Sequence, residues 1–172
     1  MCFASLRVVR HIAEHEKDMG LQVYNTLSGR KEPFVPLTPG KVNMYVCGVT
    51  TYDYCHIGHA RSAMVFDVIR SYLEYKGYMV VFVKNFTDVD DKIINRAQQE
   101  DISTREVAEK YMQAHDEDMR RLGIRPPDIA PKATEHIEEM LHIVKTLVAK
   151  GLAYPVDGDV YFSVKKFPEY GK

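Results

Sequence analysis

Residues 42–85 follow the order strand, loop, helix, strand, and this order constrains the fold more than any other feature. Residues 42–47 are β-branched and aromatic, which favours a strand. Apolar residues recur at helical spacing over 64–73, and Gly77 lies where such a helix would end. The run 78–83 is almost entirely apolar, as in a strand covered on both faces. We therefore predict a βαβ unit with a parallel sheet, and so an α/β fold.

Shorter elements are expected on either side of this unit. A strand-like piece at 22–24 precedes it, and a short helix should start at about Asp90. Ser103 to Glu106 form a capping box that opens a further helix, which Gly123 ends. Val107, Tyr111, Met119 and Leu122 should line the buried side of that helix.

The C-terminal part begins where Pro126 and Pro127 break the chain, and the segment to Pro131 is expected to be a connector. A helix capped by Thr134 should follow and end at Gly151. Residues 152–164 are typical of a hairpin with its turn at Asp157–Gly158. Because only two parallel strands are clear, the sheet would have open edges, and the pattern indicates half of a fold.

The composition is that of an ordinary globular protein, since 45% of the 172 residues are hydrophobic and 27% are charged. A net charge of −1 argues against a basic protein that coats nucleic acid. Three cysteines do not make a disulfide framework, which favours a reducing, cytoplasmic location. The apolar runs are far shorter than a membrane span, and the first 20 residues lack the apolar core of a secretory signal, so we expect no membrane association.

The loop after the first predicted strand carries the residues best suited to chemistry. In open α/β sheets, ligands bind beyond the carboxyl ends of the strands, and this loop lies there and leads into a helix. Free N–H groups at a helix start suit a phosphate, and His56 and His59 can donate further hydrogen bonds to it. Gly58 between them allows a ligand to approach the backbone closely.

Spacing alone leaves simpler interpretations open. Two histidines near a helix start are usually capping or surface residues. A single cysteine such as Cys47 at a strand end is most often a small buried apolar residue. Thr50 is as compatible with an ordinary strand end as with a binding role, whereas the place of Thr87 at the end of the second strand favours a function.

The sequence resembles a known family over residues 21–172. His56-Ile57-Gly58-His59 matches the HIGH signature of class I aminoacyl-tRNA synthetases. Four strings in order are similar to cysteinyl-tRNA synthetases in particular: M-Y-V-C-G-V-T-T-Y-D-Y-C-H-I-G-H-A-R at 44–61, N-F-T-D-V-D-D-K-I-I-N-R-A at 85–97, R-P-P-D-I-A-P-K-A-T at 125–134 and G-D-V-Y-F-S-V at 158–164.

The resemblance implies the first half of a Rossmann-like class I catalytic domain, followed by the start of the connective insertion. The expected divisions are 1–18 as an upstream extension, with Met19 as the true start, 19–125 as the first catalytic half, and 126–172 as the beginning of the connective-peptide insertion. The complete enzyme would be a monomer that converts L-cysteine and ATP, with Mg²⁺, to cysteinyl-adenylate and then transfers cysteine to tRNA(Cys).

The resemblance also implies roles for single residues. His56 and His59 would be catalytic and, with Ile57 and Gly58, would bind the ATP phosphates. Three residues match positions around the substrate cysteine: Gly48, Thr50 and Thr87. Cys47 matches a ligand of the one zinc ion per subunit, which would bind the thiolate of the substrate and so distinguish cysteine from serine. The other zinc ligands, a cysteine, a histidine and a glutamate, would come from the second half of the family's chain.

Other polar residues are expected to be structural. One of Asp88, Asp90 and Asp91 should cap the next helix while the others favour its dipole, and Cys55 should be a packed or partly exposed thiol. Three further histidines are expected to be solvated: His115, His136 and His142.

Two other functions stay open. One is a related ligase that joins cysteine to an amino sugar in thiol biosynthesis, although residues 92–97 are closer to the tRNA enzyme. The other is a non-catalytic, synthetase-derived binding module. Because the chain ends before the family's KMSKS loop and its remaining zinc ligands, we expect these residues alone to be inactive and to hold zinc weakly.

Overall fold

The computed structural model describes residues 20–172, so the predicted extension over residues 1–18 lies outside the described residues. The chain divides into a small unit, which contains the described residues up to Leu37 together with Gly171–Lys172, and a larger unit, Thr38–Tyr170. In the small unit, β1 (Gln22–Asn25) and β2 (Arg30–Pro33) pair antiparallel. No helix among the described residues is long and apolar enough to cross a membrane.

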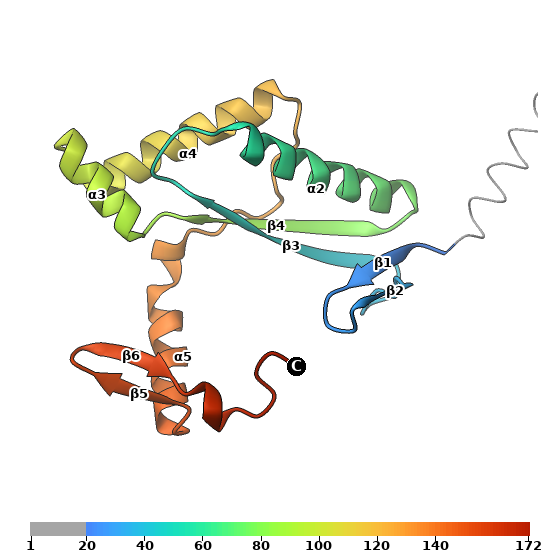
Figure 1. The fold of residues 1–172 in the computed structure, drawn as a ribbon. Coiled ribbons are helices and arrows are strands. Elements are labelled where there is room, and N and C mark those ends of the chain that lie inside the picture. The colour runs from blue at the N-terminus through green and yellow to red at the C-terminus, as the bar shows by residue number, and fades with distance from the viewer. Residues whose placement is uncertain (1–19) are drawn as a thin grey trace, which may run out of the picture. The chain divides into compact units, whose positions relative to one another are not determined.

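The centre of the larger unit is the predicted βαβ arrangement (Figure 1). It consists of β3 (Lys41–Thr50), α2 (Ile57–Tyr75) and β4 (Met79–Thr87). The two strands are parallel, with partners from Lys41 and Met79 at one end to Thr50 and Thr87 at the other. The parallel α/β fold is therefore confirmed. The prediction that a loop starts at Gly48 is wrong, because β3 resumes its pairing with β4 after a register shift between Val46 and Val49.

A third stretch of chain pairs with the other edge of β4. The backbone N–H of Lys84 donates to the carbonyl of Ile129, and that of Phe86 donates to the carbonyl of Pro131. Parallel bridges join Val83 to Ile129 and Phe86 to Lys132. The segment to Pro131 was expected to be a connector; it instead places β4 between two parallel neighbours. A proline lacks the N–H but keeps its carbonyl acceptor, which is the group used here.

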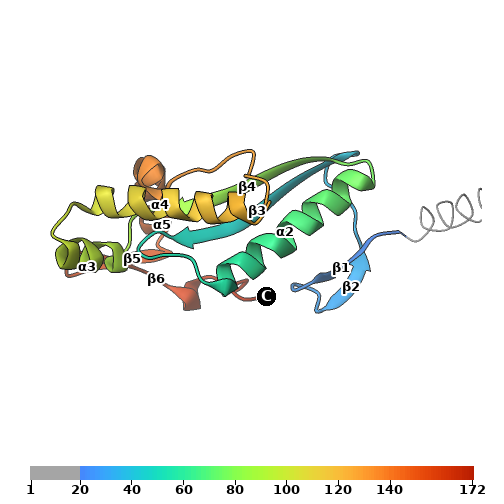
Figure 2. The same cartoon turned by 90° about the horizontal axis from the view of Figure 1, so that it is seen from above.

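Two more helices follow β4, namely α3 (Asp91–Glu100) and α4 (Thr104–Arg121). Helices α2 and α4 lie over the same face of the β3–β4 pair (Figures 1 and 2). Asp90 caps α3, and Ser103 and Glu106 form the predicted capping box of α4. The apolar side of α4 is buried as expected, except that Leu122 is exposed.

The C-terminal elements include the predicted helix and hairpin. They are the 3₁₀ turn η1 (Ala133–His136), α5 (Ile137–Ala149), β5 (Ala153–Val156), β6 (Asp159–Phe162) and the 3₁₀ turn η2 (Val164–Lys166). Asp157 and Gly158 both have positive φ, as a tight hairpin turn requires. Thr134 does not cap α5; it lies inside η1, and its N–H and hydroxyl both donate to the carboxylate of Asp88.

Arg70 on α2 fixes the chain that leads to the third strand. Its side chain is only 11% exposed, and it donates to the carbonyl of Pro126 and to the Asp128 carboxylate, each at 2.9 Å, while its Nε pairs with Glu74 at 3.1 Å. The other Asp128 carboxylate oxygen accepts the N–H of Phe82 at 2.7 Å. The guanidinium therefore links α2, the segment after Pro126 and β4.

Candidate active site

The residues selected from the sequence gather at one edge of the larger unit. Cys47, Gly48 and Thr50 lie in the last part of β3, and Thr87 is the last residue of β4. The segment 56–59 starts α2, which follows β3 after a short loop. The edge is formed by the carboxyl ends of parallel strands and a helix N-terminus, which is where open α/β sheets bind ligands.

His56 and His59 close a reciprocal capping box at the start of α2. The Nδ1 of His56 accepts the N–H of Gly58 at 3.0 Å, and the Nδ1 of His59 accepts the N–H of His56 at 3.2 Å. Their rings stack with centroids 4.0 Å apart and an interplanar angle of 26°. Both side chains are thus held by backbone groups that a helix start leaves unpaired.

These bonds decide where the imidazole hydrogens lie. Because each Nδ1 accepts a hydrogen bond, each neutral ring carries its hydrogen on Nε2. Burial lowers the pKa of His59, and the neighbouring His56, His115 and Lys84 lower it further. The neutral form of His59 therefore persists to lower pH than usual. The pair offers two Nε2–H donors that no backbone group within residues 20–172 uses.

Gly58 has a local role that its sequence position did not reveal. A Cβ at this residue would lie 2.8 Å from Cε1 and 2.9 Å from Nδ1 of the His56 ring. Any side chain would thus press on the ring that caps the helix. The glycine makes room for the cap, in addition to any close approach by a ligand.

The backbone of β3 at Gly48 lies tightly against the backbone of β4 at Asn85. A Cβ there would be 1.4 Å from the backbone oxygen of Asn85, so no side chain fits unless the strands separate. The N–H of Gly48 donates to the side-chain Oδ1 of Asn85 at 2.7 Å, and this same oxygen accepts the hydroxyl of Tyr45 at 3.0 Å. A side chain thus replaces the backbone acceptor at the register shift.

Asn85 is the residue of this site that sequence reasoning missed. Besides holding Gly48, its Nδ2 donates to the hydroxyl of Thr87 at 3.4 Å. Thr50 pairs with Thr87 across the strands, and the N–H of the fully buried Thr51 donates to the Thr87 carbonyl at 3.2 Å. The signal in the sequence was a polar amide two residues after the apolar run 78–83.

Cys47 is the one predicted metal ligand, and its side chain is exposed on the irregular part of β3. Tetrahedral zinc needs at least three protein ligands. Within residues 20–172, no three histidine, cysteine, aspartate or glutamate side chains come together as a metal site would require. The described residues therefore supply one thiol and do not form a zinc site by themselves.

The other polar residues have mixed outcomes. Asp90 caps α3 and Asp91 lies in its first turn, as expected, whereas Asp88 binds Thr134 instead of favouring the helix dipole. Cys55 is partly buried and packs against an apolar cluster, and this burial raises the pKa of its thiol. His136 and His142 are exposed as predicted.

His115 contradicts the expectation of a solvated side chain. It is 6% exposed on α4 and packs edge-to-face against Phe86, with ring centroids 5.4 Å apart. The apolar face of α4 includes position 115, because it lies four residues after Tyr111 and four before Met119. Helical periodicity therefore buries this imidazole despite its polarity.

Comparison with known proteins identifies the family to which the chain belongs. Residues 33–172 match the family model described as the catalytic domain of class I (C) tRNA synthetases. The chain belongs to this family. The match includes β3, α2 and β4, and therefore every residue of the edge described above.

Curated relatives agree with the family model. The chain is 58% identical over 152 residues to a cysteine–tRNA ligase of Pelobacter propionicus, covering 88% of this chain and 31% of that protein. It is 60% identical over 156 residues to a cysteine–tRNA ligase of Thermodesulfovibrio yellowstonii, covering 88% and 32%. The chain thus spans about a third of the length of the relatives it matches.

Solved structures share the fold. The LeuRS–tRNA–LeuAMS ternary complex of Agrobacterium radiobacter aligns with a TM-score of 0.58 at 21% identity, covering 70% of this chain and 16% of that one. Methionyl-tRNA synthetase of Mycobacterium tuberculosis, in complex with methionyl-adenylate, aligns with a TM-score of 0.54 at 19% identity, covering 70% and 28%. The first half of a Rossmann-like class I catalytic domain is confirmed.

Proposed function

We propose that this chain is the N-terminal part of a cysteine–tRNA ligase, which activates L-cysteine with ATP and transfers it to tRNA(Cys). The observation that carries the proposal is the histidine capping box at the start of α2, which occurs together with the exposed thiol of Cys47 in the preceding strand, β3. The box supplies two donors for phosphate, and the thiol supplies a soft metal ligand. The identity of about 58% to cysteine–tRNA ligases supports the same assignment.

In the proposed reaction, the residues of this chain position reactants and stabilise charge. The carboxylate of cysteine attacks the α-phosphate of ATP, which gives cysteinyl-adenylate and pyrophosphate; the terminal ribose of the tRNA then accepts the acyl group. The Nε2–H groups of His56 and His59 would donate to phosphate oxygens as negative charge develops. Ile57 and Gly58 are exposed residues in the first turn of α2 and would admit the phosphates to its N-terminus. Mg²⁺ would accompany the ATP as part of the substrate.

The amino acid would lie against the ends of β3 and β4. Gly48, Thr50 and Thr87 would surround it, with the two hydroxyls facing its polar groups. Cys47 would ligate one zinc ion per subunit, and the other ligands would come from outside this chain. The bound zinc would take up the thiolate of the substrate, a preference that serine cannot satisfy.

The organisation of the chain follows from the same assignment. We propose residues 1–18 as an upstream extension, 19–125 as the first catalytic half and 126–172 as the start of the connective insertion. The complete enzyme would be a monomeric cytoplasmic protein without membrane association.

ATP binding by the chain tests the role of the histidines. The double variant His56→Ser/His59→Gln keeps a Ser-x-x-Gln capping box and so preserves α2, but it removes both imidazole donors without adding a charge. In an NMR titration with MgATP, we expect saturable shifts around residues 56–60 in the original chain and their loss in the variant. The variant His142→Asn changes an exposed histidine on α5 and should bind as the original does. Equal ATP binding by all three proteins would refute the role of the pair.

The acceptor assay tests the substrate. The protein purified from its own cell should charge tRNA(Cys) with cysteine and leave glucosaminyl-inositol unmodified. The reverse result would assign the amino-sugar ligase, and no ligation to either acceptor would favour a binding module. We also expect the 172-residue chain alone to show no cysteine-dependent ATP–pyrophosphate exchange, and measurable exchange would overturn that expectation.

A further inference from the structure

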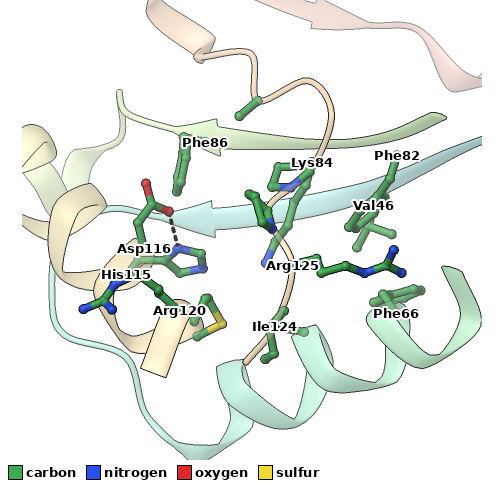
Figure 3. A pocket seen from close by; sticks show the side chains of 15 residues that line it. Val46, Phe66, Phe82, Lys84, Phe86, His115, Asp116, Arg120, Ile124 and Arg125 are labelled. Carbon is green, nitrogen blue, oxygen red and sulfur yellow. Dashed lines mark hydrogen bonds and ion pairs between the residues drawn. The ribbon is translucent and has the colours of Figure 1, made fainter. Parts of the chain in front are cut away.

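A cavity of about 450 Å³ lies between the β3–β4 pair and the helices α2 and α4 (Figure 3). Its volume is within the usual range for small-molecule sites, and it is well above the roughly 150 Å³ that accommodates a benzene ring. Most of the wall is apolar and includes three aromatic rings: Phe66, Phe82 and Phe86. None of the residues that line it belongs to the candidate active site.

His115 presents an unused acceptor within this wall. The side chain is 7% exposed, and its Nδ1 lies 3.2 Å from a carboxylate oxygen of Asp116. A carboxylate only accepts hydrogen bonds, so Nδ1 carries the hydrogen and Nε2 of the neutral ring has a lone pair. This Nε2 is buried and has no hydrogen-bond partner among the described residues. Burial also lowers the pKa of His115, which favours the neutral ring.

Lys84 supplies an unused donor to the same cavity. It extends from β4 into the space that His115 also faces (Figure 3). Its ammonium makes no hydrogen bond or ion pair within residues 20–172. The groups that act on it electrostatically are Cys55 and Asp116, and His115 already engages Asp116. The arginines at the cavity are already paired: Arg120 with Glu117, and Arg125 with Asp67 and Glu74.

We propose that this cavity binds a small hydroxylated aromatic compound of the phenol class. A phenolic hydroxyl has one hydrogen to donate and an oxygen that accepts. It would donate to Nε2 of His115 and accept from the ammonium of Lys84, so both unused groups gain a partner. The ring would pack among the three phenylalanines, where offset or edge-to-face contacts add to apolar burial.

The site adjoins α2 without sharing its catalytic edge. Ala63 and Phe66, in the second and third turns of α2, form part of the wall. Cys55 packs against Ala63, Met119 and Ile124, which all line the cavity. A bound ring would therefore contact the helix that His56 caps.

Three related probes separate hydroxyl recognition from apolar filling. They are 4-methylphenol, toluene, which lacks the hydroxyl, and 4-methylanisole, which can accept but not donate. Binding to the 172-residue chain is measured by NMR from the methyl signals of Ala63, Met119 and Ile124, which all line the cavity. We expect 4-methylphenol to bind about tenfold tighter than either of the other probes.

Two variants test the proposed partners. His115→Phe keeps an aromatic ring and removes the acceptor, and Lys84→Met keeps an apolar stem and removes the ammonium. Each should reduce the preference for 4-methylphenol over toluene to less than about threefold. The control His142→Phe, on the exposed surface of α5, should leave that preference intact. If His115→Phe does not fold, Lys84→Met carries the same comparison.

Three results would each overturn the proposal. One is the absence of saturable shifts with 4-methylphenol, which would leave solvent as the occupant. Another is equal affinity for 4-methylphenol and toluene in the original chain. The last is a preference that survives both substitutions. None of these measurements involves ATP, cysteine or tRNA, so refuting this proposal would not refute the proposed synthetase function.

Discussion

Replacing Gly48 by alanine should strongly destabilise the chain, because the new Cβ would overlap the backbone of the neighbouring strand. The Cβ would lie 1.4 Å from the Asn85 oxygen, whereas ordinary contacts begin at 3.4 Å, so the strands must separate by about 2 Å. That movement breaks the 2.7 Å bond from Gly48 N–H to the Asn85 side chain and the 3.2 Å bond from Thr51 N–H to Thr87.

The expected cost follows from these two bonds. A hydrogen bond contributes about 1 kcal/mol net, and a partly buried N–H left without a partner costs about 1–3 kcal/mol. We therefore expect the free energy of unfolding to fall by about 3 kcal/mol for Gly48→Ala. With a urea slope of roughly 1.5 kcal/mol/M, the unfolding midpoint should move down by about 2 M.

Alanine variants of two other glycines, Gly58 and Gly20, serve as controls for Gly48→Ala. At Gly58 a Cβ would meet only the flexible ring of His56, so Gly58→Ala should cost about 1 kcal/mol through the weakened cap. At Gly20 a Cβ meets nothing within 4 Å, and Gly20→Ala should change the midpoint by less than about 0.3 M. Urea unfolding followed by circular dichroism measures all three. A Gly48→Ala midpoint close to that of Gly20→Ala would refute the reasoning.

Three further variants test other contacts in the larger unit. Asn85→Ala should lower the free energy of unfolding by about 2 kcal/mol and raise the hydrogen-exchange rate of the Gly48 amide. Asn85→Asp keeps the acceptor and should leave that amide protected, so equal exchange rates in the two variants would contradict the assigned bond. Arg70→Met should cost about 3 kcal/mol in urea unfolding, because it leaves the Asp128 carboxylate without its cation; a cost below about 1 kcal/mol would count against it. Burial lowers the pKa of His115 in the folded chain, so the imidazole is protonated at higher pH in the unfolded chain, and the free energy of unfolding decreases as pH falls below about 6.5. The variant His115→Phe should therefore lose less stability than the original chain between about pH 7.5 and 5.5, and an equal loss would contradict this account.

Local patterns were enough to predict the central βαβ unit, because strand and helix periodicities depend on neighbouring residues. They were not enough to predict where β3 ends. Gly48 is typical of a loop, yet pairing resumes beyond it because Asn85, 37 residues later, supplies the missing acceptor. Such a bond exists only after the two strands are side by side, so no local pattern contains it.

The third parallel segment was missed for a related reason. Prolines at 126, 127 and 131 indicate irregular chain, since each lacks an N–H. The pairing with β4 uses the carbonyls of Ile129 and Pro131 as acceptors, and these are unaffected by the proline ring. The sequence therefore shows where an N–H donor is missing, but it does not show which carbonyls will accept hydrogen bonds from a neighbouring strand.

The helices show what periodicity can and cannot predict. It correctly identified α2, but five apolar residues at helical spacing are exposed among the described residues: Met64, Val65, Val68, Ile69 and Tyr72. Periodicity defines a face and leaves open what covers it. On α4 the opposite error occurred, because the polarity of His115 outweighed a spacing that placed it with Tyr111 and Met119 on the buried side.

The His56–His59 box explains why one short segment can both start a helix and recognise phosphate. Serine and glutamate would satisfy the same N–H groups in an ordinary capping box, but the glutamate would place a negative carboxylate beside the phosphate site. Here both Nδ1 atoms accept backbone hydrogens, which leaves both Nε2–H groups as donors. Gly58 is needed because a side chain there would press on the His56 ring. The structural requirement of the cap thus fixes the tautomer of both rings, and that tautomer is the one that can donate to a phosphate oxygen.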